Sequence, residues 1–278
     1  MRNDVPDFLK YDLSESLNLI NRDKVIKALQ GFKGQVPFDH CVIDDFFQTE
    51  IAKHLESDFI AYDDARWFYY KNSLEDKKAL NDWNAFPSLT YRAFSELVSN
   101  EFISLLSKEL GIEYFPDVGL HGGGWHIHDA GGNLNPHLDY SIHPKLGLER
   151  KLNIIIYLSS SLEDGHGGHL GLWTHDEITK RPGELTKVVQ PKFNRAVLFD
   201  TTQNSWHGMC QSLTQPKGIY RKSLAVYYLT IPSEKADTRR KALFAPREDQ
   251  KNDKEVEELI SRRVGMDSYF SAYRVGNN

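Results

Sequence analysis

The chain has 278 residues, of which 40% are hydrophobic and 26% charged, and its formal net charge at pH 7 is −5. A chain of this length and ordinary composition can bury its own core, as one large or two small domains. The acidic balance argues against a nucleic-acid-binding protein, because such surfaces are usually basic.

Membrane and secretory signals are absent from the sequence pattern. No apolar stretch approaches the roughly 18 residues that a membrane-spanning helix needs. The N-terminal segment carries acidic residues where a secretory signal has its apolar region. The only two cysteines, Cys41 and Cys210, are typical of reduced thiols. We therefore predict a soluble cytoplasmic protein with no membrane or nucleic-acid partner, and the oligomeric state stays open.

The first part of the chain has helical periodicity. A helix is expected from Arg22 to Gln30, where apolar residues share one face. Residues 38–47 predict a strand, followed by a helix with Thr49 as its N-cap. The longest apolar stripe predicts a helix from Ser88 to Leu110.

From Val118 to Thr230 the pattern changes to short β runs separated by turns rich in Gly, Asn, Asp and Pro. Several strands at this spacing predict an all-β sandwich or barrel. Helical spacing returns from Lys254 to Val264. The predicted fold class is therefore mainly β with flanking helices.

Histidines are concentrated in the β region. The chain has eleven, and all but His40 and His54 lie within it. Because i and i+2 side chains of a strand point the same way, His-x-Asp delivers an imidazole and a carboxylate together. The one such motif contains His137 and Asp139. Alone it is weak, because about one match is expected by chance and a solvated loop histidine beside an aspartate in a turn is the more common explanation.

Downstream residues make the motif more specific. The apolar run RAVLFD is followed by a polar turn and His207. A further strand opens with Arg221 and Ser223, which share one side and can hold a carboxylate. A ligand pair, a third ligand and a carboxylate anchor thus follow one another on successive strands. Two imidazoles and one carboxylate on one face are the ligand set of a non-haem iron site.

The stretch from about Val36 to Pro232 resembles the 2-oxoglutarate/Fe(II) dioxygenase superfamily, and within it the prolyl 4-hydroxylase-like branch. The matching motifs are CVIDDFF, HLD, IIIYL, GGHLGLW, AVLFD, SWHG and RKSLAVYYL. The resemblance implies a double-stranded β-helix, a distorted jelly roll, as the core. It divides the chain into an N-terminal helical segment (1–35), a dioxygenase domain (36–232) and a C-terminal helical tail packed on the core (233–278).

The resemblance also implies roles for individual residues. His137 and Asp139 would be the first two iron ligands and His207 the third. Arg221, assisted by Ser223, would pair with the far carboxylate of 2-oxoglutarate.

Two further positions match the family's co-substrate site. Relatives often place a tyrosine against the same carboxylate, at the position of Tyr157. A second polar contact commonly lies on the strand before the motif, near His128, where many relatives carry tyrosine. This departure from the family pattern leaves the role of His128 open.

The reaction that the resemblance implies uses Fe(II), 2-oxoglutarate and O2 and forms succinate and CO2. Asp139 favours hydroxylation, because halogenating relatives usually replace this carboxylate with a small residue. We expect oxidation of an unactivated C–H bond in a small-molecule or amino-acid-type substrate. Hydroxylation of prolyl residues in proteins or peptides stays open as the alternative.

Two other classes of protein compete with an oxygenase. One is a non-catalytic jelly-roll binding module, carbohydrate-binding or cupin-like, and the other is a zinc-dependent hydrolase. Neither needs a carboxylate anchor such as Arg221 with Ser223 beside the third ligand.

The remaining histidines and the tryptophans are expected to have other roles. His143 is expected in a turn or facing substrate, and His126 on the same side of its strand as His128. Structural roles are predicted for the other side chains considered, namely His166, His169, Trp125 and Trp206.

Overall fold

The structure is a computed structural model that describes residues 18–264. Residues 1–17 of the predicted N-terminal segment and 265–278 of the predicted tail lie outside the described residues. Within 18–264, no helix combines the length and the apolar character that crossing a membrane requires.

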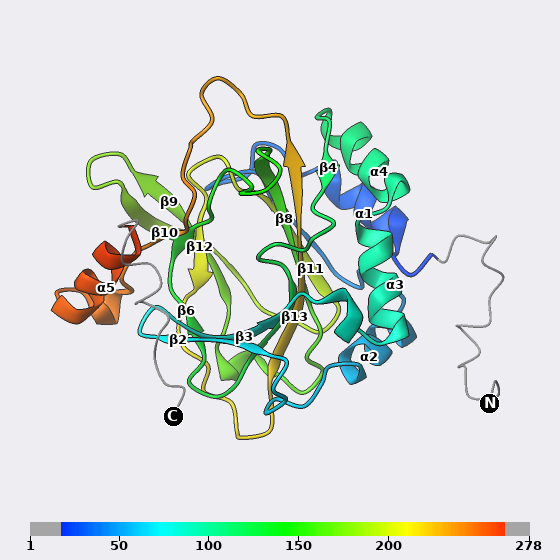
Figure 1. Cartoon of the computed structure of the whole chain (residues 1–278), viewed down its shortest axis with the longest axis horizontal. Coiled ribbons are helices and arrows are strands. Elements are labelled where there is room, and N and C mark those ends of the chain that lie inside the picture. The colour runs from blue at the N-terminus through cyan, green and yellow to red at the C-terminus, as the bar shows by residue number, and fades with distance from the viewer. Residues whose placement is uncertain (1–17, 265–278) are drawn as a thin grey trace.

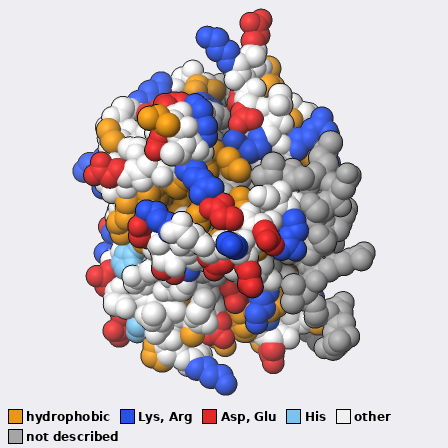
Figure 2. Space-filling view, turned by 90° about the vertical axis from the view of Figure 1, so that its left-hand side faces the viewer, with side chains coloured by type: hydrophobic (Ala, Val, Ile, Leu, Met, Phe, Trp, Pro, Cys, Tyr) orange, Lys and Arg blue, Asp and Glu red, His pale blue; other side chains and the backbone are white. Residues whose placement is uncertain are grey.

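Four helices pack on one side of the molecule, and the fifth lies on the opposite side (Figure 1). On the face that includes the fifth helix, apolar side chains lie among charged side chains of both signs (Figure 2). The helices are α1 (Arg22–Leu29), α2 (Thr49–Ser57), α3 (Ser88–Leu97), α4 (Asn100–Leu110) and α5 (Lys254–Val264).

A nine-stranded antiparallel sheet forms the larger wall of the core. Its order is β1-β11-β8-β13-β5-β3-β2, with β4 paired to β13 and β6 paired to β3. The strands are β1 (His40–Ile43), β2 (Phe68–Asn72), β3 (Glu75–Leu80), β4 (Phe115–Pro116), β5 (Gly124–His128), β6 (Asn133–Leu134), β8 (Glu149–Tyr157), β11 (Arg195–Asp200) and β13 (Arg221–Thr230).

A five-stranded antiparallel sheet forms the second wall, in the order β10-β9-β12-β7-β14. Its strands are β7 (His137–Leu138), β9 (Leu170–Asp176), β10 (Arg181–Val189), β12 (Trp206–Met209) and β14 (Leu243–Phe244). The predicted class, mainly β with flanking helices, is confirmed.

Two predicted helix boundaries are wrong. The expected helix over 88–110 is two helices, because Ser99 acts as the N-cap of α4. The Ser99 hydroxyl accepts a hydrogen bond from the Phe102 amide at 3.2 Å. The apolar stripe continues across the break, so periodicity alone does not reveal it.

The helix that opens at Thr49 has Gln48 at its N-cap position, without a side-chain cap. The tail helix has the predicted bounds.

The main apolar core lies between helices α1–α4 and the large sheet. Trp125 is fully buried there and stacks on Phe59 with ring centroids 4.7 Å apart. Trp206 is buried in the smaller sheet, where its indole N–H donates to His175 Nδ1 at 2.9 Å. Both tryptophans therefore have the packing role predicted for them.

Candidate active site

A cavity of about 430 Å³ lies between the two sheets. On β13, alternate residues from Arg221 to Tyr227 line it, because successive side chains of a strand point to opposite faces. The smaller sheet and the β2–β3 hairpin supply further walls. Sequence positions far apart in the chain therefore meet in one chamber.

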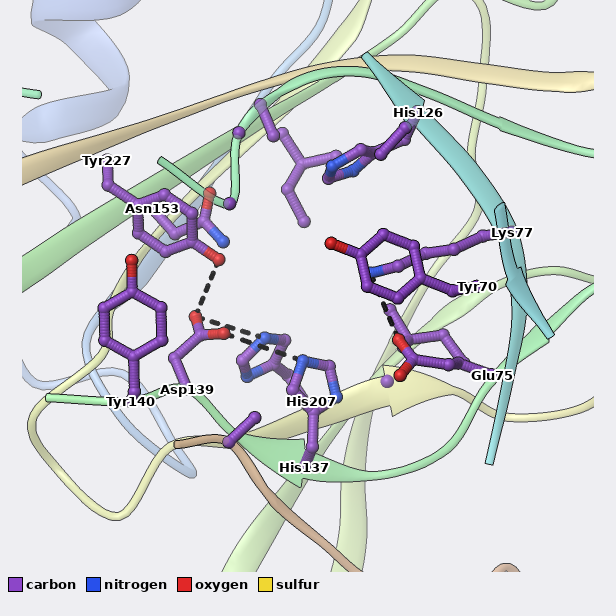
Figure 3. Close-up of a pocket in the computed structure, with 18 of the residues that line it drawn as sticks. Tyr70, Glu75, Lys77, His126, His137, Asp139, Tyr140, Asn153, His207 and Tyr227 are labelled. Atoms are coloured by element: carbon purple, nitrogen blue, oxygen red, sulfur yellow. Dashed lines mark hydrogen bonds and ion pairs between the residues drawn. The ribbon is translucent and has the colours of Figure 1, made fainter. Parts of the chain in front are cut away.

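His137, Asp139 and His207 converge at the floor of this cavity (Figure 3). His137 on β7 is the direct cross-strand partner of His207 on β12. One ligand atom from each of the three residues lies within 4.8 Å of the other two. The two imidazole Nε2 atoms are each 3.7 Å from an oxygen of Asp139, and none of the three residues is more than 8% exposed.

Backbone carbonyls orient both imidazoles. His137 Nδ1 lies 2.9 Å from the Asn135 carbonyl oxygen, and His207 Nδ1 lies 2.8 Å from that of Ser205. Each Nδ1 can therefore donate its proton, which leaves the Nε2 lone pair facing Asp139. Burial, with His207 close by, lowers the pKa of His137 to about 3, so this ring is neutral at pH 7.

Asp139 is held as a carboxylate. Burial opposes its ionisation, but His207, His137 and Arg150 keep the pKa of Asp139 below its usual value. The Tyr227 hydroxyl donates a hydrogen bond to Asp139 Oδ2 at 3.0 Å. Two imidazole nitrogens and one carboxylate oxygen facing a common point fit a divalent transition metal such as Fe(II).

Arg221 lies at the start of β13, at the same end of the cavity as His128, its cross-strand partner. It is 5% exposed, and it forms no ion pair with any carboxylate in residues 18–264. Its Nε donates to the Gly168 carbonyl oxygen at 3.0 Å. Gly168 has a positive φ, which favours glycine, and a Cβ at this position would meet Arg221 Cδ at 3.0 Å.

Arg221, Ser223 and His128 line the cavity together with the three convergent residues. Tyr157 is not among the lining residues; its ring lies beside the Arg221 guanidinium, whose carbon is 4.8 Å from the ring centroid. The Tyr157 hydroxyl and both nitrogens of His128 are buried and have no hydrogen-bond partner in the described part of the chain. Buried polar groups are rarely left unpaired, so this end of the cavity fits a polar ligand such as the carboxylate of 2-oxoglutarate.

The other histidines have structural contacts. His143 Nδ1 accepts hydrogen bonds from the backbone amides of residues 145 and 146, and its Nε2 is 3.5 Å from Asp117. His166 accepts from the Glu163 amide, and His169 hydrogen-bonds Asp164 at 2.7 Å. His126 lines the cavity beside His128, as strand alternation predicts.

Several residues that line the cavity were not predicted from the sequence. Tyr227 shares a strand face with Arg221 and Ser223, so alternation along β13 could have found it. Tyr70 and Lys77 come from the β2–β3 hairpin, opposite Tyr227 in the cavity (Figure 3). No motif marks that hairpin in the sequence.

The low pKa of His126 predicts that the free energy of unfolding depends on pH. Burial, then Lys77 and Arg221, lower the pKa of His126 to about 3. An unfolded histidine has a pKa near about 6.5. At pH values above the pKa of the histidine in the unfolded state, the full stabilisation is present. As the pH falls toward the pKa of the histidine in the folded state, this stabilisation is lost, because only the unfolded state takes up the proton. Between pH 7 and pH 5 this side chain should lower the free energy of unfolding by up to about 2 kcal/mol.

Urea unfolding of the metal-free protein at these two pH values checks this effect. The variant His126→Leu should lose less stability than the wild type on acidification. Equal losses would show that His126 titrates normally in the folded state.

Comparisons with known proteins agree with this geometry. Residues 123–229 match the sequence model of the family described as the 2OG-Fe(II) oxygenase superfamily. The mouse (Mus musculus) protein prolyl 3-hydroxylase OGFOD1 is 29% identical in an alignment of 187 positions that covers 64% of this chain and 31% of that protein. The chain thus spans about a third of the length of this curated relative.

Two solved structures share the fold. A Pseudomonas putida prolyl-4-hydroxylase superposes with a TM-score of 0.54 at 12% identity, over 74% of this chain and 98% of that one. The second is a Trichoplax adhaerens prolyl hydroxylase in complex with a peptide fragment of the hypoxia inducible factor oxygen degradation domain. It superposes with a TM-score of 0.50 at 16% identity, over 74% of this chain and 88% of that one.

The fold is a double-stranded β-helix, which is the fold of the 2-oxoglutarate-dependent oxygenases that the chain resembles. Residues 123–229 match the model of the 2-oxoglutarate/Fe(II) oxygenase superfamily, and the chain resembles the prolyl hydroxylase-like branch of that superfamily. Fe(II) and 2-oxoglutarate are the cofactors of this family, as the sequence predicted.

Proposed function

We propose that the protein is an Fe(II)- and 2-oxoglutarate-dependent hydroxylase in which His137, Asp139 and His207 hold the iron. The observation that carries the proposal is the convergence of these three buried groups within 4.8 Å of one another. Iron and 2-oxoglutarate, when bound, supply the oxidation: O2 and 2-oxoglutarate give succinate and CO2, and one oxygen atom enters a substrate C–H bond.

We assign the co-substrate site to the Arg221 end of the cavity. The planar guanidinium fork of Arg221 pairs with the far carboxylate of 2-oxoglutarate. Ser223 and Tyr157 supply hydroxyl groups, and a ring nitrogen of His128 supplies a further polar contact. The unpaired state of the buried Tyr157 hydroxyl and His128 nitrogens supports this assignment.

The protein's own groups prepare the site for oxidation. Carbonyl oxygens fix both imidazole rings, and Tyr227 fixes the carboxylate of Asp139, so the ligands need little rearrangement on binding metal. Burial of His137, Asp139 and His207 at the floor of the cavity restricts water near the reacting carbon.

The proposed substrate is a small or amino-acid-type molecule that is oxidised at an unactivated C–H bond. The second candidate is a prolyl residue of a protein or peptide, which the name of the mouse relative favours. Residues 36–232 are proposed as the catalytic domain, supported by the family match over 123–229. The cytoplasmic location stays a prediction from the sequence.

Succinate release tests the proposal. The wild-type protein with Fe(II), O2 and 2-oxoglutarate should form succinate, slowly alone and faster with a substrate found in a panel of free amino acids and proline-containing peptides. A chelator of iron should stop the reaction. A protein that binds metal but neither binds nor consumes 2-oxoglutarate would instead be a binding module or a zinc hydrolase.

A further inference from the structure

The cavity contains a second buried arginine, besides Arg221, that has no acidic partner in direct contact. Arg150 is 2% exposed and lines the cavity. Among the side chains of residues 18–264, no carboxylate forms an ion pair with it, and its Nη2 donates to the backbone carbonyl of His121. Its Nε is buried and has no hydrogen-bond partner in that range. A buried guanidinium without an acidic partner in direct contact is costly, so an anion is expected to bind there.

A β-bulge turns Arg150 into the cavity. On β8, Leu152 pairs with Tyr228, but Arg150 pairs with the next residue, Leu229, so Lys151 is the extra residue. Such a bulge re-aims the side chains beyond it. Lys151 consequently points away and pairs with Asp200 at 2.6 Å.

Two tyrosines hold the Arg150 guanidinium between their rings. The guanidinium carbon is 3.5 Å from the ring centroid of Tyr140 and 3.6 Å from that of Tyr227. This stacking covers both faces of the guanidinium and leaves only its edge for hydrogen bonds. Tyr227 also donates a hydrogen bond to Asp139, a proposed iron ligand. The Tyr227 ring therefore connects the Arg150 guanidinium to the proposed iron site.

This arginine lies far from the proposed co-substrate end. Arg221 and Tyr227 are both on β13, with five residues between them. At the usual rise of a β-strand, this separation corresponds to about 20 Å. One molecule of 2-oxoglutarate is much too short to occupy both ends. Tyr140, Asn153 and Tyr227 gather on one side of the three convergent residues, away from Lys77 (Figure 3).

The charge balance of the cavity also favours an anionic substrate. Among residues 18–264, two acidic residues line it, Asp139 and Glu75, and Glu75 lies close to both Lys77 and Arg263. Six cationic residues of the same range line the cavity, more than the acidic ones, and binding of a divalent cation and of doubly charged 2-oxoglutarate would leave that difference unchanged. The cationic lining residues are Lys77, Arg150, Arg221, Arg240, Lys241 and Arg263.

We propose that Arg150 and Asn153 form a subsite for a carboxylate or phosphate group of the substrate, next to the carbon that is oxidised. Asn153 is 3% exposed and lines the cavity. Its amide N–H can donate to the same anion. The inference rests on the proposed function, because that function gives Arg221 its own anion and leaves Arg150 for the substrate.

Anion binding to the loaded protein tests the subsite. Protein with Fe(II) and saturating 2-oxoglutarate, kept free of O2, is titrated calorimetrically with inorganic phosphate and, separately, with acetate. Arg150→Gln should weaken binding of the preferred anion at least about tenfold, as expected for loss of a charge-assisted hydrogen bond. The preferred anion identifies whether the substrate group is a phosphate or a carboxylate.

A second variant covers the case in which Arg150→Gln does not fold. Asn153→Asp keeps the side-chain shape but adds a negative charge, and it should weaken anion binding to a similar extent. Arg195→Gln is the matched control, because Arg195 pairs with Asp44 outside the cavity, and this variant should bind the anion like the wild type.

The outcomes separate this inference from the proposed function. Each folded variant should still bind Fe(II) and 2-oxoglutarate, so its anion titration uses concentrations of both that saturate that variant; failure of the wild type to bind them would refute the proposed function instead. If the loaded wild type binds neither anion, or if the folded variants bind it as tightly as the wild type does, Arg150 is only a packing residue and the subsite is wrong.

Discussion

The variant His207→Ala is expected to lose both Fe(II) binding and 2-oxoglutarate-dependent succinate formation. His137 and Asp139 would then supply two ligands from one short segment, with no third group opposite them. Changes to residues that merely support a metal ligand already cost about 10- to 100-fold in affinity. Loss of a ligand should therefore weaken Fe(II) binding by at least about 100-fold, which calorimetry without O2 can measure.

The control for this variant is His54→Ala, which removes an exposed histidine of α2 outside the cavity. It should bind Fe(II) and form succinate like the wild type. Because His207 also packs on Phe199, with ring centroids 4.6 Å apart, thermal unfolding must show that His207→Ala remains folded. A folded His207→Ala protein with wild-type Fe(II) affinity would contradict the proposed triad.

Strand alternation explains why much of the candidate site could be predicted from the sequence. His137 and Asp139 are two residues apart, as are Arg221 and Ser223, and an extended backbone turns both members of each pair to one side. The pairing of β7 with β12, which brings His207 beside His137, is a long-range contact. Only the resemblance to a known family could predict it.

Two features of the structure depend on local deviations that a periodic pattern hides. The bulge at Lys151 reverses the alternation on β8, so a regular strand would place Arg150 outside the cavity. Ser99 interrupts a helix whose apolar stripe continues on both sides of it. In both cases the apolar pattern survives, because tertiary packing accommodates the irregularity.

The variant Arg221→Met is expected to bind Fe(II) normally but to bind 2-oxoglutarate about 100-fold more weakly. The substitution removes the guanidinium and retains an unbranched apolar side chain. Loss of a buried bidentate pair with a carboxylate corresponds to about 3 kcal/mol, which is about 100-fold in affinity. Titration of 2-oxoglutarate into the Fe(II)-loaded protein without O2 measures the effect directly.

The matched control is Lys222→Met, which removes the neighbouring cation. Lys222 points to the opposite face of β13, where its Nζ donates to the Glu56 carbonyl oxygen at 3.0 Å. This variant should bind 2-oxoglutarate like the wild type. The pair of variants also separates an oxygenase from a zinc hydrolase or a simple binding module, because only the oxygenase needs a cation at this position. If Arg221→Met folds and binds 2-oxoglutarate as tightly as Lys222→Met does, the co-substrate does not bind at this end of the cavity.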